Sequence, residues 1–279
     1  LRRIMQEQPT PVVMVSTLTS EGASATLDAL SSGALDFLCK PENGRFSALR
    51  SVQDELLTKI RAAAGAKLRP RISTTSPRFQ PTLPRRSDRV VLIAASTGGP
   101  RALATLFECL PKNFPAPILM VQHMPAGFTE QFAGRLDHLG TVPCKEAKDG
   151  DLILPGLALM APGGRHMLVS SGPRVTMSDD PSLHGVRPAA DYLFLTGVRM
   201  FGARCVGVVL TGMGRDGADG ALAIKKAGGT VLAESAETCA VYGMPRAAVD
   251  TGAVDRQVPI DAMAAAIVEV VQGGMARAV

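Results

Sequence analysis

Short apolar runs alternate with amphipathic segments over residues 89–279. The runs are continuously apolar rather than alternating, which indicates strands buried on both faces of a parallel sheet. The clearest runs are Val90–Ala94, Ile118–Val121, Cys205–Leu210 and Thr230–Ala233. Shorter ones are Leu152–Leu154, Leu159–Ala161, Met167–Ser170 and Arg174–Met177, and helices are expected after Gly99, Thr129, Pro188, Asp219, Pro245 and Pro259. The pattern predicts an α/β fold with a doubly wound, mostly parallel, Rossmann-like sheet. The strands between residues 152 and 177 have no helices between them, so we expect hairpins that give the sheet an antiparallel edge.

The N-terminal part repeats this pattern on a smaller scale. Strands are expected at Pro11–Ser16 and Ala34–Lys40, a helix at Glu21–Ser32, and an amphipathic helix at Phe46–Ala64. The stretch 65–88 carries Pro, Ser, Thr and many Arg without any periodicity, which is typical of a linker. Its basic residues are read as a solvated linker, with a contact for an acidic partner as the alternative. We therefore expect domains at 1–44, with the helix continuing to about 64, and at 89–279, joined by a linker.

Length and composition narrow the classes of protein that fit. A chain of 279 residues suggests about two domains. No apolar run approaches the roughly 20 residues that span a bilayer, and the N-terminus lacks a signal-peptide pattern. The chain begins with Leu and an amphipathic segment, so we interpret it as a fragment.

The cysteines and aromatic residues exclude further classes. Five widely spaced cysteines with no Cys-x-x-Cys pair argue against a disulfide framework and against a zinc site, and they suit a reducing cytoplasm. Aromatic residues make up 4% of the chain, Trp is absent, and the net charge is only +5, which argues against nucleic-acid binding. We expect neither a metal nor a cofactor.

Ser96 follows the strand at Val90–Ala94 and precedes an expected helix. In an open parallel sheet, ligands and reactive groups collect at the carboxyl ends of the strands. Ser96 could cap the helix, the glycine-rich loop at Gly98 and Gly99 could bind a phosphate or dinucleotide, or Ser96 could be a nucleophile. The phosphate alternative is weak, because neither of the usual glycine-rich phosphate motifs is present.

Two more polar groups follow strands of the same sheet. His123 follows Ile118–Val121, where it is either a structural hydrogen-bonding residue or a general base. Asp216 lies in the glycine-rich loop after Cys205–Leu210, which is either an ordinary turn with an Asp cap or a loop whose Asp orients the histidine, with Asp219 as the main rival. The chain thus carries Ser, His and Asp at the ends of three predicted strands, in an order that differs from the three well-known triad families.

The motifs around these residues resemble the chemotaxis protein-glutamate methylesterases, the CheB family. The matching segments, in chain order, are Ala94–Pro100, Gln122–Pro125, Ala161–Met167, Leu210–Gly217 and Tyr242–Pro245. They cover nearly all of residues 89–279. A departure is Ala189, at a position where the family usually has Ser.

The resemblance implies a site and a reaction. It implies Ser96 as the nucleophile, His123 as the base and Asp216 as the residue that orients the histidine, with Met213 and Thr97 as oxyanion or positioning residues. It also implies demethylation of glutamate methyl esters and deamidation of glutamines on the cytoplasmic domain of chemoreceptors during adaptation. His166, in a family motif outside the triad, is read as loop structure or as lining of the substrate site.

Residues 1–44 resemble the C-terminal half of a flavodoxin-like phosphorylation receiver. Ser16 matches its strand-end Ser/Thr and Lys40 matches its lysine, and both are switch residues in that family. The resemblance places the phosphoacceptor aspartate upstream of Leu1 and implies a histidine kinase as the partner of a full-length receiver.

Two other function classes compete with the hydrolase. A non-catalytic dinucleotide or phosphate binder is disfavoured because no acidic residue follows Ser96 at the spacing of a ribose contact. A DNA-binding response regulator is disfavoured because residues 89–279 show no helix-turn-helix pattern.

Overall fold

The computed structural model describes residues 1–17, 19–40, 46–66 and 87–273. The chain divides into two compact units, 1–72 and 73–279. The expected domain boundaries at 44, 65 and 88 stay predictions, and residues 67–86 of the expected linker lie outside the described residues. None of the described helices combines the length and the apolar character that crossing a bilayer requires.

The N-terminal unit is built around a parallel pair of strands. Strand β1 (Val13–Ser16) pairs with β2 (Asp36–Cys39), and helix α2 (Ser20–Ser31) connects them. The Thr19 side chain caps α2 by accepting a hydrogen bond from the Gly22 N–H. Two further helices belong to this unit, α1 (Arg2–Glu7) and α3 (Phe46–Ala64), and α3 packs on both strands. The expected strands and helices of this region are therefore present.

Within residues 87–273, seven strands form one sheet in the order β11–β10–β9–β3–β4–β6–β5, and every neighbouring pair is parallel. Every residue of the central strands β3, β4 and β9 is buried, as their continuous apolar sequence predicts. The strands are β3 (Val90–Ala95), β4 (Ile118–Gln122), β5 (Cys144–Glu146), β6 (Ala158–Met160), β9 (Cys205–Val209), β10 (Thr230–Glu234) and β11 (Arg256–Val258).

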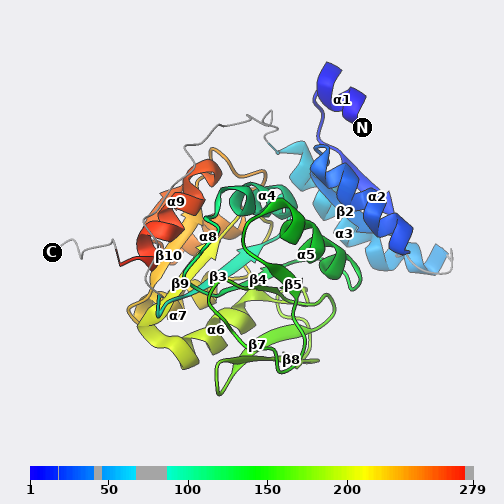
Figure 1. The fold of residues 1–279 in the computed structure, drawn as a ribbon. Coiled ribbons are helices and arrows are strands. Elements are labelled where there is room, and N and C mark those ends of the chain that lie inside the picture. Colours follow the sequence, from blue (N-terminus) through cyan, green and yellow to red (C-terminus); the bar gives the residue numbers. More distant parts are fainter. Residues whose placement is uncertain (18, 41–45, 67–86, 274–279) are drawn as a thin grey trace. The chain divides into compact units, whose positions relative to one another are not determined.

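Helices cover both faces of this sheet, so the predicted doubly wound α/β fold is confirmed (Figure 1). On one face α4 (Gly99–Cys109) packs against α5 (Phe128–Leu139) and α9 (Ile260–Val271). On the other, α7 (Ala218–Lys226) packs against α6 (Ala190–Phe201) and α8 (Met244–Asp250). A short 3₁₀ helix, Gly202–Arg204, leads into β9.

The antiparallel pair is present, but it forms a sheet of its own. Strands β7 (His166–Ser170) and β8 (Arg174–Ser178) form a two-stranded antiparallel sheet beside α6, and Arg174 of β8 makes an isolated bridge with Leu152. The strand expected at Leu152–Leu154 is wrong, because only Leu152 makes an isolated bridge there. The run at Leu159–Ala161 is not part of a hairpin either. As β6 it lies between β4 and β5 in the parallel sheet, where its apolar residues are buried on both faces.

Strand β3 has β4 on one side and β9 on the other, so the order of strands reverses at this point. The chain first runs from β3 outward through β4, and later returns to β9 on the opposite side of β3. In doubly wound sheets, the carboxyl ends of strands at such a reversal border the ligand crevice. The loops after β3, β4 and β9 therefore meet at the edge where function is expected.

Glu234, at the end of β10, is a carboxyl group buried in this fold, with 1% of its surface exposed. Burial raises its pKa to about 7. Hydrogen bonds from the Thr211 N–H and the side chains of Thr238 and Cys239 oppose this rise, and the charge of Asp261 adds to it. Since the unfolded carboxyl titrates near 4.5, the folded protein holds the extra proton between about pH 4.5 and 7. The free energy of unfolding therefore falls as the pH rises through that window.

Glu234→Gln is expected to stabilise the protein at about pH 8 but not at about pH 5. The amide keeps an oxygen for the Thr211 N–H and can donate to the Thr238 hydroxyl, while it removes the cost of the buried charge, on the order of 2–3 kcal/mol. Urea unfolding of both proteins at the two pH values measures this. An equal difference in stability at both values would contradict the buried-charge explanation.

Candidate active site

The register of β3 and β4 brings the Ser96 and His123 loops together. Ala95 pairs with Gln122 across the two strands, and Ser96 and His123 are the residues that directly follow. The His123 N–H donates a hydrogen bond of 3.1 Å to the Ala95 carbonyl, which extends the pairing into the loop. The hydroxyl and the imidazole therefore come from adjacent positions at one edge of the sheet.

The third predicted residue, Asp216, reaches His123 from the loop after β9. His123 Nε2 lies 2.7 Å from Asp216 Oδ2. The carboxyl group is 2% exposed and the imidazole is 11% exposed, so the pair is shielded from water. A carboxylate accepts hydrogen bonds, so Nε2 carries the proton and the Nδ1 lone pair is left to accept one from a hydroxyl.

Backbone groups of α6 fix Asp216 in place. Its Oδ2 accepts the Ala190 N–H at 2.6 Å and its Oδ1 accepts the Asp191 N–H at 3.0 Å. These are first-turn N–H groups, which have no partner within their own helix. Burial alone would raise the pKa of Asp216, but the hydrogen bond and charge of His123, together with the two backbone N–H groups, hold it below its usual value. Asp216 is therefore an anion at neutral pH.

The structure argues against two alternatives, helix capping by Ser96 and an orienting role for Asp219. The N-cap of α4 is Gly98, and Ser96 contacts the helix start through its backbone carbonyl, which accepts the Gly99 N–H at 2.7 Å, so Ser96 is not the N-cap residue. Asp219, the rival of Asp216, lies in the first turn of α7, where it is exposed and forms an ion pair with Arg215 at 2.8 Å.

Glycines allow the loops to approach one another closely. The Ser96 N–H donates to the Thr211 carbonyl at 3.0 Å, so the loop after β9 lies against the loop after β3. A Cβ on Gly212 would lie 2.7 Å from the Ser96 Cβ, which leaves no room for any larger residue. Met213 follows as a half-buried residue, and Thr97 is 3% exposed. The oxyanion roles of Met213 and Thr97 stay predictions.

Together these groups have the composition of a site for nucleophilic catalysis. A hydroxyl, an imidazole and a buried carboxylate lie on neighbouring strand ends, and the imidazole and carboxylate are hydrogen-bonded. These are the three groups that serine hydrolases use to activate a serine for attack on an acyl group.

Gln122, the last residue of β4, ties the two loops together and was not singled out as a site residue from the sequence. Its Nε2 donates to the Ser96 carbonyl at 3.0 Å and to the His123 carbonyl at 3.2 Å. The side chain is 2% exposed, and its Oε1 has no hydrogen-bond partner among the described residues. A Cβ on Gly99 would lie 2.0 Å from that oxygen, so the glycine makes space for the amide. The feature of the sequence that points to Gln122 is a polar residue at the end of a continuously apolar strand.

Gln122→Met is expected to slow the reaction of Ser96 with a serine-directed phosphonylating probe by about 10–100-fold, because the two loops lose their common anchor. Stability should change by only about 1 kcal/mol, because the exchange also removes the unpartnered Oε1. The labelling rate and the melting temperature measure the two effects. Gln257→Met, the same exchange at an exposed residue of β11, serves as the control. An unchanged labelling rate for Gln122→Met would refute the anchoring role.

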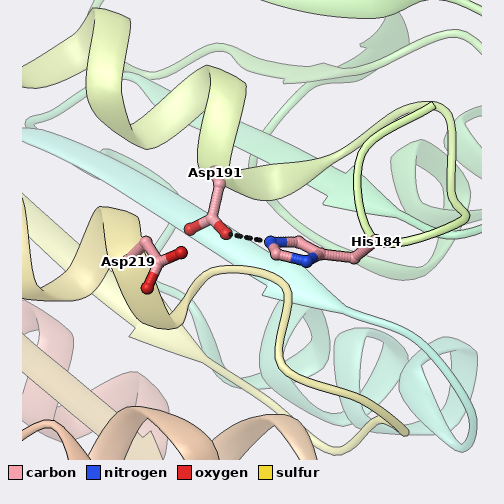
Figure 2. Close-up of side chains that lie close together, drawn as sticks. All are labelled: His184, Asp191 and Asp219. Atoms are coloured by element: carbon pink, nitrogen blue, oxygen red, sulfur yellow. Dashed lines mark hydrogen bonds and ion pairs between the residues drawn. The ribbon is translucent and has the colours of Figure 1, made fainter. Parts of the chain in front are cut away.

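His184 and Asp191 form a second His–Asp pair (Figure 2). His184 Nε2 lies 3.0 Å from Asp191 Oδ2, and Asp191 Oδ1 accepts the Gly220 N–H at 2.7 Å. Asp191 is 1% exposed, and burial, with the nearby charge of Asp216 adding to it, raises its pKa. Asp191 therefore joins the first turns of α6 and α7, while its own N–H holds Asp216.

Asp219 lies beside this pair, and the nearest ligand atoms of His184, Asp191 and Asp219 are within 4.8 Å of one another (Figure 2). That spacing fits a divalent cation. However, His184 already bonds Asp191, and the guanidinium of Arg215 pairs with Asp219. We therefore interpret His184 and Asp191 as support for Asp216, whereas Asp219 pairs with Arg215.

His166 is a structural residue. It is fully buried, its Nδ1 accepts the Ala189 N–H at 3.1 Å, and its Nε2 lies 3.2 Å from the Pro181 carbonyl. Both ring nitrogens thus contact backbone groups, which favours a role of His166 in loop structure over a role in lining a substrate site.

In the N-terminal unit, Ser16 and Lys40 lie together at the carboxyl ends of β1 and β2. The Lys40 N–H donates to the Ser16 carbonyl at 2.6 Å, and the Ser16 hydroxyl donates to the Gly22 carbonyl at 3.0 Å. Their switch role stays a prediction.

Comparison with known proteins agrees with the motifs. The family model of the CheB methylesterases matches residues 91–267. The protein-glutamate methylesterase/protein-glutamine glutaminase of Pyrococcus abyssi is 44% identical over 98% of this chain and 78% of its own length. The one from Symbiobacterium thermophilum is 44% identical over 98% of this chain and 80% of its own. The crystal structure of the Thermotoga maritima CheB methylesterase catalytic domain matches with a TM-score of 0.64 and 41% identity, over 66% of this chain and 98% of that one.

Proposed function

Because the chain belongs to the CheB methylesterase family, we propose that it is a carboxylic ester hydrolase that removes methyl esters from glutamate side chains of chemoreceptors. The same acyl chemistry deamidates selected glutamine side chains. The observation that carries the proposal is the 2.7 Å His123–Asp216 bond beside the loop of Ser96.

In the first half of the reaction, the Ser96 hydroxyl attacks the ester carbonyl carbon. His123 Nδ1 accepts the hydroxyl proton as the new C–O bond forms. The carbonyl oxygen becomes an oxyanion, which the backbone N–H of Met213 stabilises. Thr97, which follows Ser96 on the nucleophile loop, is the second oxyanion or positioning residue. Asp216 holds the imidazole orientation and stabilises the imidazolium that results.

In the second half, the tetrahedral intermediate collapses and the bond to the methoxy group breaks. His123 returns its proton to that group, so methanol leaves and an acyl-enzyme on Ser96 remains. Water then attacks the acyl carbon with His123 as the base, which releases the glutamate carboxylate and restores the hydroxyl. With a glutamine side chain, ammonia leaves in place of methanol.

On the basis of the family, we also propose a substrate, a cellular location and a mode of regulation for this enzyme. We propose the cytoplasmic domain of a methyl-accepting chemoreceptor as the substrate and the cytoplasm as the location of the enzyme. Residues 1–44 act as part of a receiver, with Ser16 and Lys40 as switch residues. A histidine kinase is the partner of the full-length receiver.

The proposal is tested by incubating the chain with a chemoreceptor cytoplasmic fragment that carries labelled methyl esters. We expect labelled methanol in the supernatant and free carboxylates on the receptor. A receptor fragment with glutamines at the same positions should release ammonia. Release of neither product would overturn the proposal. A rise in melting temperature with nucleotides and no reaction with serine-directed probes would instead support the dinucleotide- or phosphate-binding alternative.

A further inference from the structure

Thr211, which follows β9, joins the segments around the nucleophile. It is 2% exposed. Its carbonyl accepts the Ser96 N–H at 3.0 Å, and its hydroxyl donates to the Thr97 carbonyl at 2.9 Å. The same hydroxyl oxygen accepts the Val241 N–H at 3.0 Å. One small side chain thus connects the nucleophile loop, the glycine-rich loop and the segment before α8.

The side chain of Glu234 fixes the position of Thr211. Its Oε2 accepts the Thr211 N–H at 2.9 Å, and its Oε1 accepts the Thr238 hydroxyl at 3.0 Å. The carboxyl group comes from β10, a strand that carries none of the proposed triad residues, and burial raises its pKa to about 7. Burying a carboxyl group costs stability, and groups with strongly shifted pKa values are concentrated at functional sites.

The residues after Thr211 have a fixed path because of these contacts. The Gly212 N–H donates to the Val241 carbonyl at 3.1 Å, and the Gly212 carbonyl accepts the Met244 N–H at 2.8 Å. A Cβ on Gly243 would lie 3.2 Å from the Met213 Cα, so this segment packs directly on the backbone of Met213. The direction of the Met213 N–H therefore depends on the position of Thr211.

We propose that Thr211 and Glu234 are positioning residues, which hold the Met213 N–H and the Ser96 loop in the relative position that the transition state requires. This inference rests on the proposed function. The oxyanion forms only during the reaction, so misplacing its donor lowers kcat and leaves substrate binding unchanged.

Four variants in the full chain test this role through kcat and KM for methanol release from methyl-labelled receptor fragment. Thr211→Val and Glu234→Met remove the hydroxyl and the carboxyl acceptor, and each is expected to lower kcat about 100-fold with KM unchanged. Thr211→Ser keeps the hydroxyl and Glu234→Gln keeps an acceptor for the Thr211 N–H, so each should retain kcat within about threefold.

Thr196→Val is the matched control. Its hydroxyl accepts the Val169 N–H at 3.0 Å, a contact of the same kind made in the β7 region with none of the loops around Ser96. It should lower the melting temperature and leave kcat unchanged. All assays are run well below the melting temperature of each variant, and Thr211→Val alone decides the test if Glu234→Met does not fold.

The outcomes separate the inference from the proposed function. A wild-type chain that releases no methanol, or a Ser96→Ala variant that releases as much, rejects the proposed function. An active wild type with an unaffected kcat in Thr211→Val rejects the inference. A kcat loss in Thr196→Val equal to that in Thr211→Val rejects it as well, because the effect would then be general destabilisation.

Discussion

Ser96→Ala is expected to lower methanol release by about 10⁶-fold, the loss seen when the nucleophile of a serine hydrolase is removed. Without the hydroxyl no acyl-enzyme forms, and His123 has no proton to accept from residue 96. The fold should stay intact. Ser96 is held through its backbone N–H and carbonyl, which the exchange preserves, and it does not cap α4. The free energy of unfolding should change by no more than about 0.5–1 kcal/mol.

The control for this prediction is Ser170→Ala. Ser170 lies at the end of β7, where its hydroxyl donates to the Arg174 carbonyl within the hairpin. This variant should release methanol at the wild-type rate. Turnover by Ser96→Ala within about tenfold of wild type would reject the serine mechanism.

Asp216→Asn is expected to lower kcat by about 10⁴-fold, as in other triads where the carboxylate becomes an amide. Three N–H groups converge on the two carboxylate oxygens, from His123, Ala190 and Asp191. An amide has a single oxygen, so in either orientation its NH₂ faces a backbone donor. The imidazolium also loses its counter-charge. Each mismatched donor costs about 1–3 kcal/mol, so the melting temperature should fall as well.

Asp219→Asn is the matched control for Asp216→Asn. Asp219 is exposed and pairs with Arg215 across one turn of chain. Ion pairs of this kind contribute little, so both kcat and stability should stay near wild type. If the Asp219 variant lost as much activity as the Asp216 variant, the assignment of the orienting carboxylate would be wrong.

The residues on strand ends could be predicted because the sequence displays both the strand and its end. The apolar runs of β3, β4 and β9 stop at polar, glycine-rich loops, and parallel strands bring those loops to one edge. Ser96, His123 and Asp216 become candidates in this way, with Asp219 as the rival of Asp216, and the family resemblance then implies their roles. The structure brings His123 and Asp216 into hydrogen-bonding contact.

The supporting residues could not be predicted in the same way, because their roles depend on contacts through space. Glu234 ends an apolar strand with no motif around it, and its partner Thr211 lies 23 positions away. Asp191 looks like an ordinary acidic residue in the first turn of a helix, but it faces a second helix and His184. Gln122 is part of a recognised motif, yet nothing in the sequence shows that its amide bridges two loops.

The edge strands were missed for a related reason. Strands β5 and β11 are three residues long and only partly buried, so they show no continuous apolar run. Leu152–Leu154 is apolar enough to suggest a strand, yet Leu152 and Leu154 are exposed and only one bridge forms there. Apolar sequence predicts burial well, but strand pairing depends on which neighbour lies alongside.

The central claim is that the hydroxyl of Ser96 is activated by the His123–Asp216 pair. Its most direct test is to treat the chain with a serine-directed phosphonylating probe and map the adduct by peptide mass spectrometry. We expect a single adduct on Ser96 that forms rapidly in the wild type and is lost in His123→Ala. An adduct on another serine, or equal labelling of Ser96 after His123 is removed, would contradict the claim.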